Sequence, residues 1–186
     1  PGHVGLLHKL TNLTPFKLVR NSEYGESEEY IDSGQWWDGG PPDSIDAFES
    51  GAWGCCTKSG VFNSSGTAAT FVYRADSTAD KKPFDVILSH KLSADKTKWP
   101  KLSGSLENRR LRYGLSGEGS VEDHHNVFKD MKTFPESTEK PDINIKLKWA
   151  FKRAKLPTVE WTLTQVEVGA EEKIAALTVD AMRSVS

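Results

Sequence analysis

No stretch of this sequence stays apolar for the roughly 18–20 residues that a membrane-spanning helix needs, so a helical membrane protein is excluded. An excess of positive charge is also missing, because 24 Lys and Arg residues oppose 26 Asp and Glu residues and leave a net charge of −2. Proteins dedicated to nucleic acids are usually basic or carry a concentrated basic face, so we expect no nucleic-acid partner. Neither an initiator methionine nor a signal peptide precedes Pro1, which favours a trimmed or mature chain.

Cysteine is scarce, since the two cysteines of the chain, Cys55 and Cys56, are adjacent. A disulfide between neighbours closes a strained ring, so the pair predicts no disulfide framework. Two thiols in a strand-like run are usually small buried hydrophobic side chains, which is the interpretation we favour. The alternative, a redox or metal pair, lacks the usual Cys-x-x-Cys spacing. The sequence leaves the compartment open between secreted and cytoplasmic, with peripheral membrane association as a further expectation.

Recognisable catalytic motifs are missing as well. The chain has no dinucleotide fingerprint, phosphate loop or His-Glu-x-x-His, and a near-match to a nucleophile elbow lacks its last glycine. The triplet Asp123-His124-His125 offers metal-ligand types that His8 or His90 could complete in space, but we interpret it as a solvated loop. We therefore expect no enzymatic activity, no cofactor and no bound metal.

What the chain does contain is an alternation of apolar and polar residues with a period of two. Its 186 residues fit a single domain, 1–186, and its six Trp and eight Phe residues argue against disorder. Candidate strands lie at residues 3–10, 16–18, 45–48, 52–57, 67–74, 84–90 and 110–113. Many short strands joined by Gly, Pro and Ser turns predict an all-β protein with the fold of an antiparallel β-sandwich.

The clearest pattern is in the last third of the chain. Apolar residues alternate over Ile143–Phe151 and again over Val159–Leu163, which predicts a hairpin with Trp149 and Trp161 in the core. Residues 170–182 follow with helical spacing, two leading glutamates and a late arginine. They predict a short C-terminal amphipathic helix that packs on the sandwich.

Two polar stretches interrupt the strands. The first polar connection, residues 20–43, is rich in turn-forming and charged residues, so we expect it to be mostly exposed. The second polar connection, residues 114–141, is polar and rich in turns, with no strand or helix predicted in it. Four basic residues alternate along the predicted hairpin: Lys146, Lys148, Lys152 and Arg153. Such a stripe is usually a solvated face, and the alternative is a contact with anionic lipid or acidic glycans.

The first polar connection carries more aromatic surface than a linker requires, namely Tyr30, Trp36 and Trp37. Tryptophan combines apolar area with one N–H donor, which suits both membrane interfaces and sugar faces. The structural alternative is that one tryptophan caps the end of the sandwich. Neighbours in an extended segment face opposite ways, so we expect one indole to point inward and the other outward.

Several short motifs are shared with known families. They are Asn12-x-Thr14, Phe16-x-Leu18, Gly34-x-Trp36, Pro41-Pro42 before Ile45, and Ser65-Gly66-Thr67. Together they resemble the aegerolysin family over residues 4–90, which implies a small β-sandwich associated with membrane lipids and pore formation. Residues 51–54, 66–69 and 72–74 resemble the plant jasmonate-induced proteins. Gly51-Ala52-x-Gly54 and Tyr113-Gly114-Leu115 are similar to elements of actinoporin-like cytolysins and fungal fruit-body lectins, which implies work at cell surfaces.

Two functions remain as hypotheses. The first is a non-enzymatic, cytolysin- or toxin-like or defence protein that recognises a membrane lipid, such as a sphingolipid or a sterol-containing membrane, as a self-oligomer or with a second protein component. Actinoporins make their pore with an N-terminal helix, whereas this chain starts on a strand, so lipid recognition is implied more strongly than pore formation. The second is a lectin or stress-response carbohydrate-binding protein. The candidate binding residues for both are Tyr30, Trp36, Trp37 and Tyr113.

Overall fold

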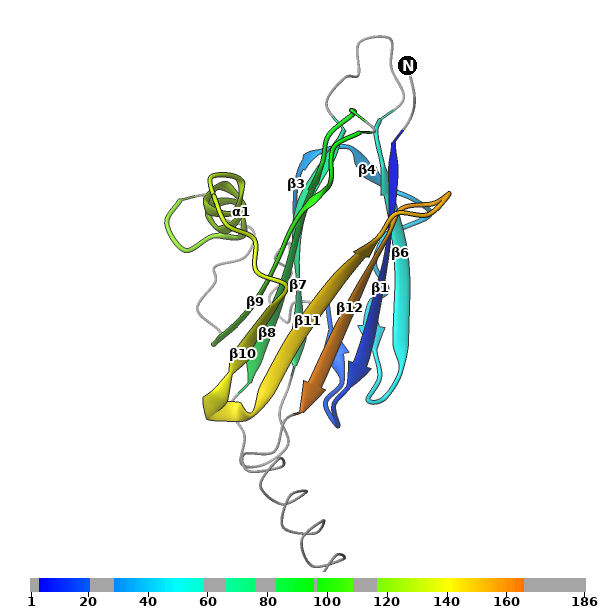
Figure 1. Cartoon of the computed structure of the whole chain (residues 1–186). Coiled ribbons are helices and arrows are strands. Elements are labelled where there is room, and N and C mark those ends of the chain that lie inside the picture. The colour runs from blue at the N-terminus through cyan, green and yellow to red at the C-terminus, as the bar shows by residue number, and fades with distance from the viewer. Residues whose placement is uncertain are drawn as a thin grey trace, which may run out of the picture.

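The computed structural model describes residues 4–20, 29–58, 66–75, 83–95, 97–108 and 117–165. Two β-sheets face each other across a shared hydrophobic core (Figure 1). The predicted all-β sandwich is therefore confirmed. Within these residues, no helix combines the length and the apolar character that crossing a membrane would take.

The first sheet has six strands in the order β10-β11-β12-β1-β6-β4. Their bounds are β10 (Ser137–Lys140), β11 (Ile145–Lys152), β12 (Thr158–Gln165), β1 (Gly5–Leu13), β6 (Ser50–Cys56) and β4 (Gln35–Trp36). Neighbours are antiparallel except β1 and β12, which run parallel with Leu10 opposite Trp161. This parallel pair departs from the purely antiparallel prediction, and it brings the beginnings of β1 and β12 to the same end of the sandwich.

The second sheet follows the order β5-β2-β7-β8-β9, and β3 also pairs with β7. Its strands are β5 (Ser44–Ile45), β2 (Leu18–Val19), β7 (Thr67–Ala75), β8 (Phe84–Leu92), β9 (Lys101–Asn108) and β3 (Glu29–Ser33). The helix α1 (Val121–Lys129) packs on β3, β7 and β8 on the side away from the first sheet (Figure 1). Because β7 and β8 are covered on both faces, they are buried almost throughout, which explains their nearly continuous apolar runs.

The predicted hairpin is confirmed as β11 and β12, with Trp149 directly opposite Trp161. Both indoles are buried in the core between the sheets. Cys55 and Cys56 are both buried and free, as the interpretation as small hydrophobic side chains predicted. Large aromatic side chains and the thiol of Cys55 thus fill the space between the two layers.

The prediction for the second polar connection was wrong, because it contains α1 and β10. Ser120 caps α1 by accepting a hydrogen bond from the backbone N–H of Asp123 at 3.0 Å. The buried face of the helix consists of Val121, His125 and Phe128. Since a histidine occupies the middle of this face, the apolar periodicity that identifies a helix is hidden in the sequence.

The first polar connection contains two short strands, β3 and β4, that the sequence did not predict, although nearly all of its described residues are exposed or half-buried. These short strands are added to the sheets through backbone pairing, with Ile31 opposite Ala69 and Trp36 opposite Cys55. Their side chains are polar or half-buried, so no alternation marks them in the sequence. The predicted strand at 110–113 and the predicted helix at 170–182 lie outside the described residues.

Candidate functional site

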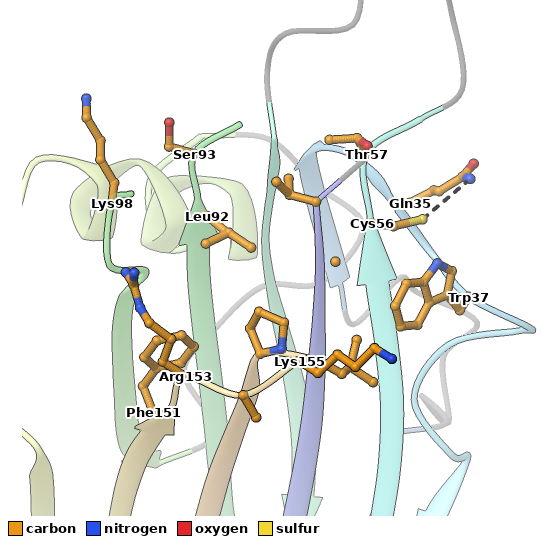
Figure 2. Close-up of a pocket in the computed structure, with 15 residues that line it drawn as sticks. Gln35, Trp37, Cys56, Thr57, Leu92, Ser93, Lys98, Phe151, Arg153 and Lys155 are labelled. Carbon is orange, nitrogen blue, oxygen red and sulfur yellow. Dashed lines mark hydrogen bonds between the residues drawn. The ribbon is translucent and has the colours of Figure 1, made fainter. Parts of the chain in front are cut away.

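A pocket of about 650 Å³ opens at the end of the sandwich where β1 and β12 begin, towards the top of Figure 1. We call it the end pocket, and Figure 2 draws its lining. It is lined by Val4, Gly5, Gln35, Trp37, Cys56, Thr57, Leu92, Ser93, Lys98, Phe151, Arg153, Ala154, Lys155, Leu156 and Pro157. Its volume is within the range of about 300–1,000 Å³ that is typical of small-molecule sites.

The parallel pairing of β1 with β12 assembles this pocket. It sets Leu7 opposite Thr158, and the backbone N–H of Leu7 donates to the carbonyl of Pro157 at 2.8 Å. The turn between β11 and β12 therefore lies beside the start of β1. The end of β6 joins them, since Gly5 pairs with Cys56. Residues from both ends of the chain are thereby brought to one site.

Trp37 forms one wall of the pocket and rests on two glycines. Its backbone N–H donates to the carbonyl of Gly54 at 2.8 Å. A Cβ atom added to Gly54 would lie 1.9 Å from the indole, and one added to Gly5 would lie 2.7 Å from it. The indole therefore occupies space that any side chain at these positions would fill. The two glycines thus determine where the indole ring of Trp37 lies.

Arg153 lines the opposite side of the pocket, and Trp99 supports it from outside the lining. The guanidinium carbon of Arg153 lies 4.9 Å from the centroid of the Trp99 ring, and its Nη2 donates to the carbonyl of Thr97 at 3.3 Å. Trp99 in turn meets Phe151 edge-on, with ring centroids 5.1 Å apart. The stacking and the hydrogen bond hold the cation in one orientation.

The lining of the pocket is positively charged, with Lys98, Arg153 and Lys155 and with no aspartate or glutamate. Among the described residues, no carboxylate forms a salt bridge with any of these three cations. Two lysines of β11, in contrast, are paired at 3.3 and 3.0 Å: Lys146 with Glu139 and Lys152 with Glu160. The pocket thus gathers cations whose charge no nearby salt bridge offsets.

Apolar side chains are exposed around the same opening. Trp99 is 64% exposed, Leu156 42% and Trp37 36%. Leaving such large apolar side chains in contact with water costs free energy. Exposed tryptophans beside basic residues are typical of surfaces that enter the interfacial region of a bilayer. At the opposite end of the sandwich, Phe48 is exposed to a similar degree, 66%.

A second group of reactive side chains lies deep between the sheets. We call His8, Cys55 and His90 the buried histidine–cysteine cluster, because one potential ligand atom of each lies within 4.8 Å of the others. Cys55 Sγ is 3.8 Å from His8 Nε2 and 3.4 Å from His90 Nε2. His8 also stacks on Trp53 with a ring-centroid distance of 5.2 Å. By residue type this is the group closest to a metal site.

The hydrogen bonds of the cluster do not fit a metal ion. Trp161 Nε1–H donates to His8 Nδ1 at 3.0 Å, so neutral His8 carries its proton on Nε2 and has no lone pair there for a metal. Burial raises the pKa of Cys55 to about 12, which keeps it a protonated thiol. Burial also lowers the pKa of His90 to about 3, so that it stays neutral. The cluster is a polar network sealed inside the core.

The triplet Asp123-His124-His125 does not converge on a metal either, because successive helical residues point in different directions. Asp123 completes the cap of α1 by accepting from the backbone N–H of Gly119. His125 Nδ1 lies 2.7 Å from Thr70 Oγ1, and its Nε2 is 3.4 Å from Asp32 Oδ2. The expected solvated loop was wrong, since this histidine fastens α1 to the second sheet.

The predicted binding residues are separated. Trp37 lines the pocket, whereas Trp36 packs against the core and donates its indole N–H to Glu29 at 2.9 Å. The expectation of one inward and one outward indole is confirmed. Tyr30 packs beneath α1, 5.4 Å from the ring of His125. Tyr113 lies outside the described residues.

Sequence reasoning missed most of the pocket. Of its cations only Arg153 was singled out, as part of a stripe, while Lys98, Lys155 and Leu156 were not, nor was Trp99, which supports Arg153. A signal was present, because Lys98-Trp99-Pro100 and Lys155-Leu156-Pro157 each place a cation and a large apolar residue before a proline. Such triplets occur in turns, where a large apolar side chain has no core to enter.

No protein-family model matches the chain, and no curated protein matches it. Among solved structures it is similar to the lipid binding protein Nakanori, with a TM-score of 0.64 and 12% identity over 88% of this chain and 72% of that one. It is also similar to the Xerocomus chrysenteron lectin XCL. A mutated form gives a TM-score of 0.47 at 9% identity, over 88% of this chain and 99% of that one. The wild-type lectin gives 0.40 at 10%, with the same coverage.

At this level of identity, the similarity to Nakanori shows a shared fold. The β-sandwich implied by the resemblance to aegerolysins is thereby confirmed, while no family model supports membership of that family.

Proposed function

We propose that this protein is a recognition protein that attaches peripherally to lipid membranes through its end pocket. The observation that carries the proposal is that Trp37, Leu156 and Trp99, which stacks on Arg153, are exposed beside three cations that form no salt bridge with any described carboxylate. Indole rings favour the level of the lipid head groups, and lysine and arginine favour the negative surface of a membrane. Both preferences are met by the same orientation of the molecule.

The fold is compatible with this function, because a protein described as lipid binding shares it. The pocket also favours recognition over catalysis. Its lining offers no histidine and no carboxylate that could act as a general base or activate Cys56. We therefore propose a binding protein without enzymatic activity.

Co-sedimentation with liposomes tests the proposal, using a lipid panel that includes sphingomyelin and sterol. Trp99→Ala and Leu156→Ala should each weaken partitioning about tenfold, because burial of a large apolar side chain is worth about 1.5–3 kcal/mol and 1.4 kcal/mol is a factor of ten. Phe48→Ala is the matched control, since this residue is equally exposed at the opposite end. Failure of every lipid composition to retain the protein, or an equal loss in the control, would contradict membrane attachment by this end.

A second candidate function is carbohydrate binding in the same pocket. Trp37 offers an indole face on which a sugar could stack, Gln35 and Thr57 supply polar groups on the same side of the pocket, and Ser93 supplies one across it. A glycan array with wild type and Trp37→Ala distinguishes the two functions. Binding to a narrow set of glycans, lost in the variant and accompanied by indifference to liposomes, would favour the lectin function.

Pore formation and toxin or defence activity are finer proposals that depend on membrane attachment. They would need assembly on the membrane, with other copies of the chain or with a second protein component. Release of an encapsulated dye from liposomes tests this step separately. Binding without dye release would limit the function to recognition.

A further inference from the structure

The end pocket divides into two chemically different sides. Figure 2 shows Lys98 and Arg153 on one side, and Trp37 with Gln35 and Cys56 on the other, where the side chain of Lys155 also ends. The space between them is bordered by apolar groups, including Leu92. A ligand that fills the pocket must therefore carry negative charge at one end and an apolar or weakly polar body beside it.

We propose that the end pocket selects membrane lipids whose head group carries a phosphate and net negative charge, with Arg153 and Lys98 as the phosphate ligands and Lys155 as a further positive charge across the opening. This inference rests on the proposed membrane attachment and adds the class of lipid. Nothing in the lining compensates three positive charges, so the pocket attracts an anion and disfavours a cation. Outside the lining, Asp95 interacts electrostatically with Lys98, so the uncompensated charge is that of Arg153 and Lys155.

Arg153 is the residue best prepared to receive a phosphate. Its guanidinium is already stacked on Trp99 and bonded to the carbonyl of Thr97 through Nη2, so little conformational freedom is lost on binding. A planar guanidinium with several N–H donors matches phosphate oxygens in a two-pronged geometry. Lys98 and Lys155 add mobile point charges from two neighbouring turns.

The source of the phosphate is a lipid because the opening is surrounded by exposed apolar surface. Trp99, which holds Arg153, is itself 64% exposed, and Leu156 follows Lys155 directly. A small water-soluble phosphate would contact the cations and leave this surface in water. A phospholipid would occupy both, with its glycerol and upper acyl groups against the apolar side chains.

Partitioning onto vesicles at physiological salt tests the inference. Vesicles of phosphatidylcholine alone are compared with vesicles that also contain phosphatidic acid, for wild type, Arg153→Gln, Lys98→Gln and Lys155→Gln. Preference for the anionic vesicles should fall about fivefold for each cation removed. Lys148→Gln is the matched control, because it removes the same charge from an exposed position of β11 that does not line the pocket.

The outcomes separate this inference from the proposed function. Equal binding to both vesicle types would overturn the selection of anionic lipid and leave membrane attachment intact, while binding to neither would overturn both. A loss in Lys148→Gln as large as in Arg153→Gln would mean general surface attraction and would also overturn the inference.

Competition with soluble compounds identifies the source of the phosphate. Dihexanoyl phosphatidic acid, used as dispersed monomers, should release the protein from the vesicles at far lower concentration than glycerol phosphate does. Equal potency of the two compounds would show that the apolar surface contributes nothing, and the lipid would then be the wrong ligand class.

Discussion

The buried histidine–cysteine cluster and the end pocket both contain residue types that binding sites use, and they differ in what those residues are free to do. In the cluster, His8 accepts a hydrogen bond from Trp161 and Cys55 is held as a thiol away from solvent. In the pocket, Lys155 and Arg153 have no salt bridge within the described residues and face an opening. Solvent access and hydrogen-bond donors that have no partner therefore identify a candidate binding site better than residue type does.

The largest effect should come from removing the indole that orients the buried cluster. Trp161→Ala should lower the free energy of unfolding by about 3–5 kcal/mol, because it empties a large volume in the core and removes the donor to His8. Trp37→Ala, at the pocket, should cost well under half as much. Urea unfolding of both variants measures the difference. Similar losses in the free energy of unfolding would contradict the distinction between the buried cluster and the solvent-accessible end pocket.

Acid should destabilise the protein through the same cluster. Burial lowers the pKa of His90 to about 3 and that of His8 well below its ordinary value of 6.5, and the charge of a neighbouring histidine lowers both further. Below about pH 6.5 these two histidines are therefore protonated in the unfolded chain and remain neutral in the folded chain. Stability should be constant above that pH and should fall below it by about 1.4 kcal/mol per pH unit for each of the two histidines.

Urea unfolding at about pH 7 and about pH 5 measures this loss. An unchanged free energy of unfolding between the two conditions would show that the histidines are protonated in the folded protein, and the sealed network would then be wrong.

Adjacent cysteines should differ in reactivity. Cys55 is almost completely buried and burial raises its pKa to about 12, whereas Cys56 is in the lining of the end pocket. A small thiol reagent should modify Cys56 first in the folded protein and Cys55 only on unfolding. Mass spectrometry of the peptides, with Cys56→Ser as control, reports the order, and bound anionic lipid should slow the first reaction.

The smallest effect on stability should follow from Gly54→Ala. This substitution tests whether the position of the Trp37 indole matters for the end pocket. The added Cβ would lie 1.9 Å from the Trp37 ring, so the ring must move off its place beside the pocket. Because Trp37 is partly exposed, it can shift outward, and we expect a loss of stability of roughly 1 kcal/mol with clearly weaker ligand binding. Unchanged binding would mean that the position of this ring does not matter.

The sequence allowed the core of the fold to be predicted where burial on one face produces alternation. The hairpin of β11 and β12 is the clearest case, because Trp149 and Trp161 point into the core and lysines and threonines alternate with them. α1 was missed because His125 interrupts its apolar face and is satisfied by Thr70, a contact that only the folded chain creates. Short strands such as β4 depend on backbone pairing, which leaves no pattern in the side chains.

The site was only partly predictable for a related reason. Trp37 was identified because it is one of several aromatic residues in a polar connection. The cations that share its pocket, Lys98, Arg153 and Lys155, come from two other turns. Arg153 and Lys155 lie near Trp37 because β1 and β12 pair in parallel, whereas Lys98 comes from the turn between β8 and β9 of the second sheet. Local periodicity contains neither of these long-range arrangements.

The most direct test of the central claim is amide hydrogen exchange of the whole chain with and without vesicles that contain phosphatidic acid. We predict that the lipid slows exchange in the turns that form the end pocket, at residues 153–157 and 97–101, and leaves residues 44–50 at the opposite end unchanged. Protection confined to residues 44–50, or vesicle binding without protection of either pocket turn, would contradict the assignment of the end pocket as the binding site.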